Sequence, residues 1–369
     1  MSRVRPFVED DIEQVSDLHQ RVFGADDSHS PQETVSELQQ SYADYFERVF
    51  LRNPWRDKAL PSLVYEGADG KITGFLGVLP RRMLLNGTPI SVALSSQFIV
   101  DPNSRATGAG VWLLKSFLTG PQDLSLTDEA NNISRKIWEG LGGSTALLYS
   151  VRWTRLLRPS RYAINHLKGQ GALSLLASAS KPLCNLLDAA LAWKSPHRFR
   201  QTEPDVSAEE LNANTLLACL SEFSSSRSLW PEYDEYSLKW LLEILTRQTH
   251  RGALRKLAIR NSKREVIGWY LYYLNPGGES RVVQLVAKKH LIDAVLDHLF
   301  YDAWLNGSVA VSGRLEPPFM QAFSDKYCHF NCGQPWMLIH SHNPDILRAF
   351  HYGDALLSPL EGEMCMRFM

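Results

Sequence analysis

The stretch "VDPNSRATGAGVWLLKSF", residues 100–117, decides how the first part of this chain folds. An apolar run, residues 98–100, leads into Asp-Pro-Asn-Ser, which continues neither a strand nor a helix. After Gly110 the sequence becomes rich in apolar residues again. This order predicts a strand, a glycine-bearing loop and a helix, with glycines spaced as in neither GxGxxG nor GxxxxGK[ST].

The two glycines of this loop, Gly108 and Gly110, indicate a ligand that approaches the backbone closely, because glycine carries no Cβ. The N–H groups of residues 107–111 fall at the start of the predicted helix, where unpaired donors and the helix dipole favour an anion. A pyrophosphate fits such a place. The alternative is a turn in which both glycines only shape the chain.

Length and composition set the outer bounds. A chain of 369 residues with 44% hydrophobic and 21% charged residues is long enough for two globular domains. Lys and Arg total 39 against 40 Asp and Glu, a net charge of −1, so nucleic acid is not expected as the principal partner. Five cysteines, an odd number, speak against a disulfide framework. The sequence shows no signal peptide and no run of 18 uncharged apolar residues, which predicts a cytoplasmic protein.

The first 155 residues alternate strand and helix patterns. Ile12, Val15, Leu18 and Val22 repeat at helical spacing, residues 33–52 form a second helical stretch, and several strands follow. Asp69-Gly70 and Asn86-Gly87 are hairpin signals between these strands, and "TALLYSV", residues 145–151, predicts a further strand. We therefore expect an α/β domain built on a mixed sheet.

The loop and a later segment together resemble the GNAT N-acetyltransferase superfamily. "RATGAG", residues 105–110, has the form [RQ]xxGx[GA] of its acyl-coenzyme A signature. A second pattern follows in "NNISRKIWEGLGG", with Asn131, Ser134, Trp138 and Gly142 at the family's spacing. The resemblance covers residues 3–150 and implies an acyl-CoA-dependent transfer to an amine.

The resemblance also implies which residues hold the cosubstrate, acetyl-CoA or another acyl-CoA, without a metal. Backbone groups of the strand ending at Val100 would meet the pantetheine amides, and Arg105 would add charge near the phosphates. The implied cosubstrate-binding residues are Phe98, Ile99, Val100, Arg105, Ala106, Thr107, Gly108, Ala109, Gly110 and Asn131.

The catalytic groups are less clearly marked. Many relatives carry a tyrosine acid in the second pattern, where this chain has Trp138, whose indole cannot protonate a thiolate. Tyr149 on the next strand is a substitute acid, and Glu66 is a candidate base; ordinary structural roles are the alternative for both. A water held by the neighbouring polar residues 95–97 is another candidate base. Asp128 and Glu129, at a strand end, are placed to meet an amine or simply to begin a helix.

The second half resembles a degenerate copy of the first. Residues 71–75, Lys-Ile-Thr-Gly-Phe, have a counterpart in residues 265–269, Glu-Val-Ile-Gly-Trp, but the counterpart of the loop, "LVAKKHLIDAVL", has no glycine. We predict two tandem GNAT-like domains, 1–155 and 206–369, joined by a helical linker or insertion at 156–205, with the coenzyme site only in the first. The arrangement resembles Fem-type peptidyltransferases and N-myristoyltransferases, which implies an acceptor in the groove between the halves.

Two further segments leave alternatives open. Residues 169–200 are apolar with flanking arginines, which is typical of helices on a membrane surface or of helices packed across a domain junction. A zinc site is one interpretation of four residues, Cys328, Cys332, His340 and His342. The CxxxC spacing differs from the common CxxC spacing of zinc sites, which favours a structural cluster of small buried residues.

The sequence therefore predicts an N-acyltransferase acting on a small-molecule or peptide amine. The rivals are a coenzyme-binding or interaction module without turnover, indicated by Trp138 in the acid position, and a Fem-like aminoacyl transferase. The last is disfavoured because the chain lacks the basic excess that a tRNA donor requires.

Overall fold

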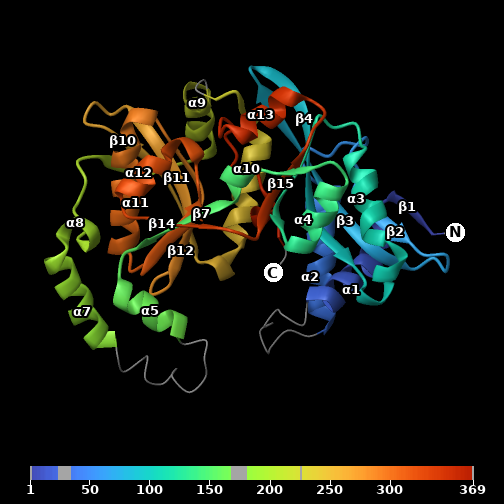
Figure 1. Ribbon diagram of the computed structural model, residues 1–369, viewed down its shortest axis with the longest axis horizontal. Coiled ribbons are helices and arrows are strands. Elements are labelled where there is room, and N and C mark those ends of the chain that lie inside the picture. Colours follow the sequence, from blue (N-terminus) through green and yellow to red (C-terminus); the bar gives the residue numbers. More distant parts are fainter. Residues whose placement is uncertain (1, 24–34, 168–180, 225–226, 368–369) are drawn as a thin grey trace.

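The computed structural model describes residues 2–23, 35–167, 181–224 and 227–367. These residues form two mixed β-sheets, each covered by helices and lying at opposite ends of the long axis in Figure 1. The predicted α/β class with mixed sheets is confirmed.

The first sheet has the strand order β1-β2-β3-β4-β5-β15-β6, with the short strand β9 (Leu229–Pro231) paired beside β3. The long hairpin of β3 and β4 turns at Asn86 and Gly87, whose φ angles of 50° and 83° are the left-handed values that the sequence pair predicts. The bounds are β1 Arg3–Pro6, β2 Leu63–Glu66, β3 Ile72–Leu85, β4 Thr88–Val100, β5 Leu124–Ala130, β6 Ser144–Thr145 and β15 Trp336–His340.

Helices cover both faces of this sheet. Helix α1 (Ile12–Phe23) buries Val15 and Leu18 completely, as its spacing predicts. The second predicted helical stretch forms α2 (Val35–Phe46), which continues into one π-helical turn, Glu47–Leu51. On the other side lie α3 (Ala109–Leu118) and α4 (Asn132–Gly140).

The second sheet repeats this plan, with the order β8-β10-β11-β12-β13-β7-β14. Its strands are β7 Val151–Leu156, β8 Ser207–Glu210, β10 Ala253–Arg260, β11 Val266–Leu274, β12 Glu279–Ala287, β13 Ala310–Arg314 and β14 His329–Cys332. Around it lie α9 (Ala213–Ser224), α10 (Glu235–Arg247), α11 (Ile292–Leu305) and α12 (Met320–Asp325). Helix α13 (Pro344–His351) instead packs against the turn at Leu147–Ser150.

The two halves exchange one strand each. Strand β7 follows the first half in sequence but lies between β13 and β14 in the second sheet. Strand β15 follows the second half but lies between β5 and β6 in the first sheet. Each sheet is therefore completed by the other half of the chain.

Most of the predicted strand at residues 145–151 takes another form. Only Ser144–Thr145 pair as β6, and Leu147–Ser150 form a 3₁₀ turn. The reason is that the chain must leave the first sheet here, so that β7 can begin at Val151 in the second.

A small helical projection connects the halves, formed by α5 (Pro159–Leu167), α7 (Lys181–Lys194) and α8 (Pro196–Phe199). Figure 1 shows α7 at the lower edge of the molecule, beyond the second sheet. Its large apolar side chains Leu183, Leu186, Leu187 and Trp193 are 59%, 69%, 49% and 87% exposed. Within the described residues, no helix is both long enough and apolar enough to cross a bilayer.

Candidate functional site

A cleft opens in the first sheet where β4 and β5 separate. The two strands are parallel and pair only from Val92 to Leu94 on β4 and from Leu124 to Leu126 on β5. Both strands continue beyond this point, to Val100 and Ala130. The unpaired ends leave backbone N–H and C=O groups facing a gap that an extended ligand can fill.

A bulge in β4 shapes one wall of the cleft. The pairing with β3 shifts register between Ser96 and Ile99, so that Gln97 and Phe98 stand opposite one residue. Gln97 has φ 51°, a value that a residue with a side chain rarely adopts. The bulge turns the Gln97 N–H towards the cleft, where it donates to Glu363 Oε1 at 3.0 Å.

The glycine loop lies directly after this strand. Residues 102–107 form a 3₁₀ turn, and Gly108, with φ 72°, precedes α3 in the left-handed conformation. A Cβ at Gly110 would lie 3.2 Å from the Phe98 ring, so Gly110 lets the first turn of α3 approach β4 closely. Among the residues that the structure describes, no side chain caps α3, and its first turn contains no acid, so this N-terminus is suited to an anion.

A cavity of about 210 Å³ fills the cleft. Its walls come from α1, β4, α3, β5, α4 and the C-terminal segment. The lining residues are Phe23, Ser95, Gln97, Phe98, Leu114, Thr127, Glu129, Ala130, Asn131, Ser134, Trp138, Glu363 and Arg367.

The C-terminal segment is fixed against the cleft by buried charge. Asp128 on β5 is fully buried and pairs with Arg314 of β13 at 2.9 Å. Its other oxygen accepts the backbone N–H of Glu363 at 2.6 Å. Since breaking a buried pair on one side costs about 3–5 kcal/mol, this contact strongly favours one position of the segment.

Two further carboxyl groups face the cavity. Glu363 is half-buried, because part of its surface borders the cavity. The carboxyl nevertheless lies deep in the molecule, and this burial raises its pKa to about 8. Burial and the neighbouring Asp128 raise the pKa of Glu129 as well, against the opposing charges of Arg314, Arg152 and Arg367. An acid with a pKa near neutrality can both accept and return a proton.

A hydrogen-bonded chain holds the bulge from behind. His19 of α1 and the Gln97 side-chain oxygen lie 2.8 Å apart, and the Gln97 amide donates to the Tyr45 hydroxyl at 3.0 Å. Tyr45 in turn donates to the Met366 carbonyl at 2.6 Å. The bulge, two helices and the C-terminal segment are thus joined around one side of the cavity.

The three-dimensional structure is similar to solved acyltransferase structures. A GCN5-related N-acetyltransferase from Anabaena variabilis superposes with a TM-score of 0.59 at 11% identity, over 95% of this chain and 75% of that one. A probable N-acyltransferase of unknown function from Enterococcus faecalis gives 0.58 at 11% identity, over 92% and 73%. The chain has the fold of the GCN5-related N-acetyltransferases. Neither a protein-family model nor a curated protein matches its sequence.

The fold is also similar to that of an acyltransferase solved with a bound acyl-CoA. The N-myristoyltransferase of Saccharomyces cerevisiae, solved with myristoyl-CoA, superposes with a TM-score of 0.51 at 10% identity, over 96% of this chain and 84% of that one. The likeness extends over both halves of the chain.

The predicted cosubstrate residues lie at the end of β4, on the turn into α3 and at the start of α4, and two of them line the cavity. Phe98 and Asn131 line the cavity, and Val100 packs near Gly110, whereas the Ile99 side chain is buried in the core on the opposite face of β4. Asn131 caps α4 by accepting from the N–H groups of Ile133 and Ser134. Thr107, Gly108, Ala109 and Gly110 form the turn into α3; the side chains of Arg105 and Ala106 lie outside the described residues.

Trp138, at the predicted acid position, has a structural environment. It is 1% exposed, donates from Nε1 to the Ile339 carbonyl at 3.1 Å, and packs on Phe117. A Cβ at Gly143 would lie only 1.9 Å from its ring, so the glycine makes room for the indole. Trp138 thereby attaches α4 to the exchanged strand β15.

The two predicted catalytic residues lie away from this cavity. Tyr149 is fully buried, donates to the Ala355 carbonyl at 2.7 Å and accepts the Ala355 N–H at 2.8 Å, and burial raises its pKa far above the usual value. Glu66 ends β2 and pairs with Arg5 and Arg3 of the edge strand β1, which lower its pKa. The structure brings neither side chain to the lining of the cleft.

Sequence analysis missed Glu363 and Arg367, because they are remote in sequence from the GNAT patterns. Glu363 precedes Met364, Cys365 and Met366, which are all buried, but that run does not distinguish its carboxyl from an ordinary surface acid.

Proposed function

We propose that the chain is an acyl-CoA-dependent N-acyltransferase with its active site in the cleft between β4 and β5. The observation that carries this proposal is the opening of two parallel strands beside a glycine turn and an uncapped helix N-terminus. The pyrophosphate of the cosubstrate would lie at the start of α3, and the pantetheine arm would add to the free edge of β4. Acetyl-CoA is the first cosubstrate to test.

The acids of the cavity suit an amine acceptor. An amine arrives protonated at neutral pH and can donate hydrogen bonds to Glu129 and Glu363, which attract it more strongly as their carboxyl groups ionise. Glu363 is the proposed base: it takes one proton from the ammonium, and the amine nitrogen then bonds to the thioester carbon. As the carbon–sulfur bond breaks, the nitrogen releases its second proton to water. The thiolate leaves as the anion, which is a tolerable leaving group because a thiol has a pKa of about 8.5. Tyr149 and Glu66 have no part in this scheme.

The two sheets favour a tandem GNAT arrangement, because their seven main strands follow one another in the same order. The acceptor would then enter from the side where the C-terminal segment, Glu129 and the second half meet.

The experiment has two stages. Coenzyme A should raise the Tm, because a ligand that binds only the native state stabilises it. Thiol release from acetyl-CoA is then measured with amino sugars, polyamines and peptide amines. An unchanged Tm at millimolar coenzyme A would reject the site, whereas binding without amine-dependent thiol release across the panel would favour a non-catalytic coenzyme-binding module.

We also propose that α7 rests on an anionic membrane surface. Its exposed apolar row is accompanied by seven basic residues and one acid, Asp188, within residues 158–200, in a chain of net charge −1. The basic residues are Arg158, Arg161, Lys168, Lys181, Lys194, Arg198 and Arg200. In a sedimentation assay, the wild type should bind phosphatidylserine vesicles but not vesicles of phosphatidylcholine alone, and Trp193→Ser should bind neither. Equal sedimentation of the wild type and the variant with both kinds of vesicle would refute the membrane proposal.

A further inference from the structure

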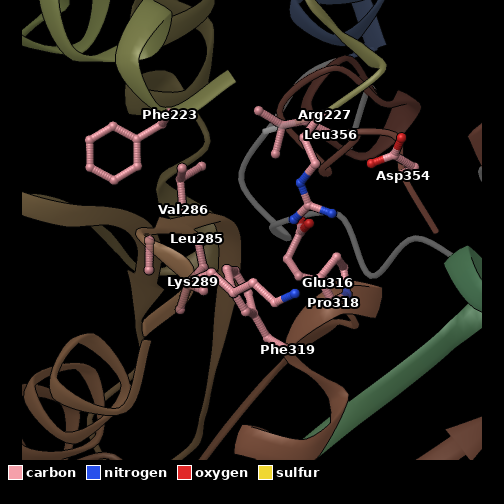
Figure 2. Close-up of a pocket in the computed structure, with 11 residues that line it drawn as sticks. Phe223, Arg227, Leu285, Val286, Lys289, Glu316, Pro318, Phe319, Asp354 and Leu356 are labelled. Carbon is pink, nitrogen blue, oxygen red and sulfur yellow. The ribbon is translucent and has the colours of Figure 1, made fainter. Parts of the chain in front are cut away.

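The second sheet contains a cleft in the same position as the first. Strands β12 and β13 are parallel and pair only between Glu279–Arg281 and Ala310–Ser312. Beyond these residues β12 continues unpaired with β13 to Ala287, just as β4 continues beyond its last residue paired with β5. The separation contains a cavity of about 160 Å³ (Figure 2).

A buried carboxyl group forms the floor of this cavity. Glu316 is 4% exposed and lines the cavity, and its Oε2 has no hydrogen-bond partner among the described residues. An unpaired polar atom of this kind costs about 1–3 kcal/mol unless a ligand or a water satisfies it. The carboxyl therefore calls for a hydrogen-bond donor from outside the chain.

Two cations accompany the carboxyl. Figure 2 shows Arg227 above Glu316 and the Lys289 side chain extending towards it along the cavity wall. The acid Asp354, at the rim, already accepts the backbone N–H of Ser228 at 3.2 Å. The remaining walls are apolar, from Phe223, Leu285, Val286, Pro318, Phe319 and Leu356.

We propose that this second cleft binds a small aliphatic α-amino acid. Its ammonium would donate to Glu316, its carboxylate would meet Arg227 and Lys289, and its side chain would lie against the apolar walls. A cavity of about 150 Å³ holds a benzene-sized molecule, so an aliphatic side chain fits while the charged groups remain near the open side. The site is separate from the proposed acyltransferase cleft and stands without it.

The pH dependence of binding distinguishes an amino acid from a plain carboxylate. Burial raises the pKa of Glu316 to about 8, and the groups facing it are Arg227, Arg314, Glu361 and Tyr149, with Lys289 and Asp354 in the same cavity. An ammonium ligand requires ionised Glu316, so its binding releases a proton at pH 7 and strengthens up to pH 8. A plain carboxylate would instead bind the protonated acid, and its binding would weaken over that range.

The test is calorimetric titration of the full chain with L-leucine, 4-methylpentanoate, which lacks the amine, and 3-methylbutylamine, which lacks the carboxylate. We expect leucine to bind at least about tenfold more tightly than either analogue, with proton release in buffers of different ionisation enthalpy. Glu316→Gln keeps the shape of the side chain and should weaken leucine binding about tenfold or more.

The charge partners have a matched control. Lys289→Met should weaken leucine and 4-methylpentanoate alike, whereas Lys288→Met, one residue away and paired with Glu222 at 2.6 Å, should change neither by more than about twofold. The proposal is wrong if leucine shows no heat of binding, if 4-methylpentanoate binds as tightly as leucine, or if Glu316→Gln binds leucine unchanged. Because the readout is binding without CoA, its failure leaves the acyltransferase proposal standing.

Discussion

The two clefts of this molecule lie at the same pair of parallel strands in their sheets and differ in the loop that follows the first strand of the pair. In both sheets a pair of parallel strands separates after three paired residues. After β4 the chain enters α3 through Gly108 at φ 72°, whereas after β12 it enters α11 through Lys288 and Leu291, whose φ angles of −61° and −122° are ordinary. The separating strands make the opening in both sheets, and the loop after the strand determines whether backbone N–H groups can surround a phosphate.

The largest effect should follow from separating the halves. Because β7 and β15 are exchanged, a fragment of residues 1–204 lacks the strand between β5 and β6, and the remaining fragment lacks the strand between β13 and β14. Each fragment alone should be largely unfolded by circular dichroism and proteolysis, while co-expression should recover a soluble complex. Independent folding of either fragment would show that the exchange is not needed for stability.

The next effect concerns the loop. Gly108→Asp should abolish detectable coenzyme A binding, at least about a hundredfold loss, because it places a negative charge at the proposed pyrophosphate site. A Cβ at Gly108 meets only the Trp112 ring, at 3.8 Å, and Asp tolerates positive φ, so the variant should fold.

Two controls isolate the charge. Gly108→Asn has the same shape and should retain most of the binding measured by thermal shift. His290→Asp puts the same charge on the exposed loop of the second half, where it should leave coenzyme affinity unchanged. Equal losses in the two Asp variants would contradict the placement of the coenzyme in the first cleft alone.

Much of the fold was predictable because it rests on local signals. The hairpin at Asn86-Gly87, the spacing of Val15 and Leu18, and the glycine loop each act within a few residues. The strand exchange was not predictable, since the short apolar run of β15 would suit a buried strand in either sheet. Which sheet it joins depends on contacts with β5, about 200 residues earlier.

The candidate site divides in the same way. Phe98 and Asn131 belong to contiguous patterns and line the cavity, and Gly108 and Gly110 form the turn into α3 directly after β4. Glu363 comes from the far end of the chain, and its position depends on the buried contact of its N–H with Asp128. No local pattern carries that information.

The third prediction removes the proposed base. Glu363→Gln should lower kcat for amine-dependent thiol release about a hundredfold or more, with coenzyme affinity retained, because the amide still accepts from Gln97 N but cannot take a proton. The wild-type rate should rise through about pH 8, where the Glu363 carboxyl ionises, and the variant should lose that step. An unchanged rate would remove Glu363 from the mechanism.

The fourth prediction applies to the acid of the second cleft. Burial places the folded-state pKa of Glu316 at about 8, above the unfolded value near 4.5, so the folded state holds the proton more tightly. The contribution of Glu316 to the free energy of unfolding is complete below pH 4.5 and is lost as the pH rises through 8. The free energy of unfolding of the wild type should therefore fall as the pH rises from 5.5 to 8. In Glu316→Gln, which has no carboxyl to titrate at this position, the fall should be smaller by about 1–3 kcal/mol, measured by urea unfolding at each pH. A fall of the same size in both proteins would mean that Glu316 is ionised throughout.

The smallest effect on catalysis is expected at the residue that replaces the usual acid. Trp138→Tyr should change the rate of thiol release less than about fivefold, because positioning the amine beside the thioester supplies most of the acceleration and the thiolate leaves without help. It should nevertheless lower the free energy of unfolding by about 1–3 kcal/mol, since the bond from Nε1 to Ile339 and part of the packing on Phe117 are lost. Tyr149→Phe is the matched comparison: it leaves the Ala355 N–H unpaired and should also cost stability with no change in rate. A large gain in rate with Trp138→Tyr would instead indicate that proton transfer to sulfur limits turnover, and Glu363 would then be the wrong residue on which to centre the mechanism.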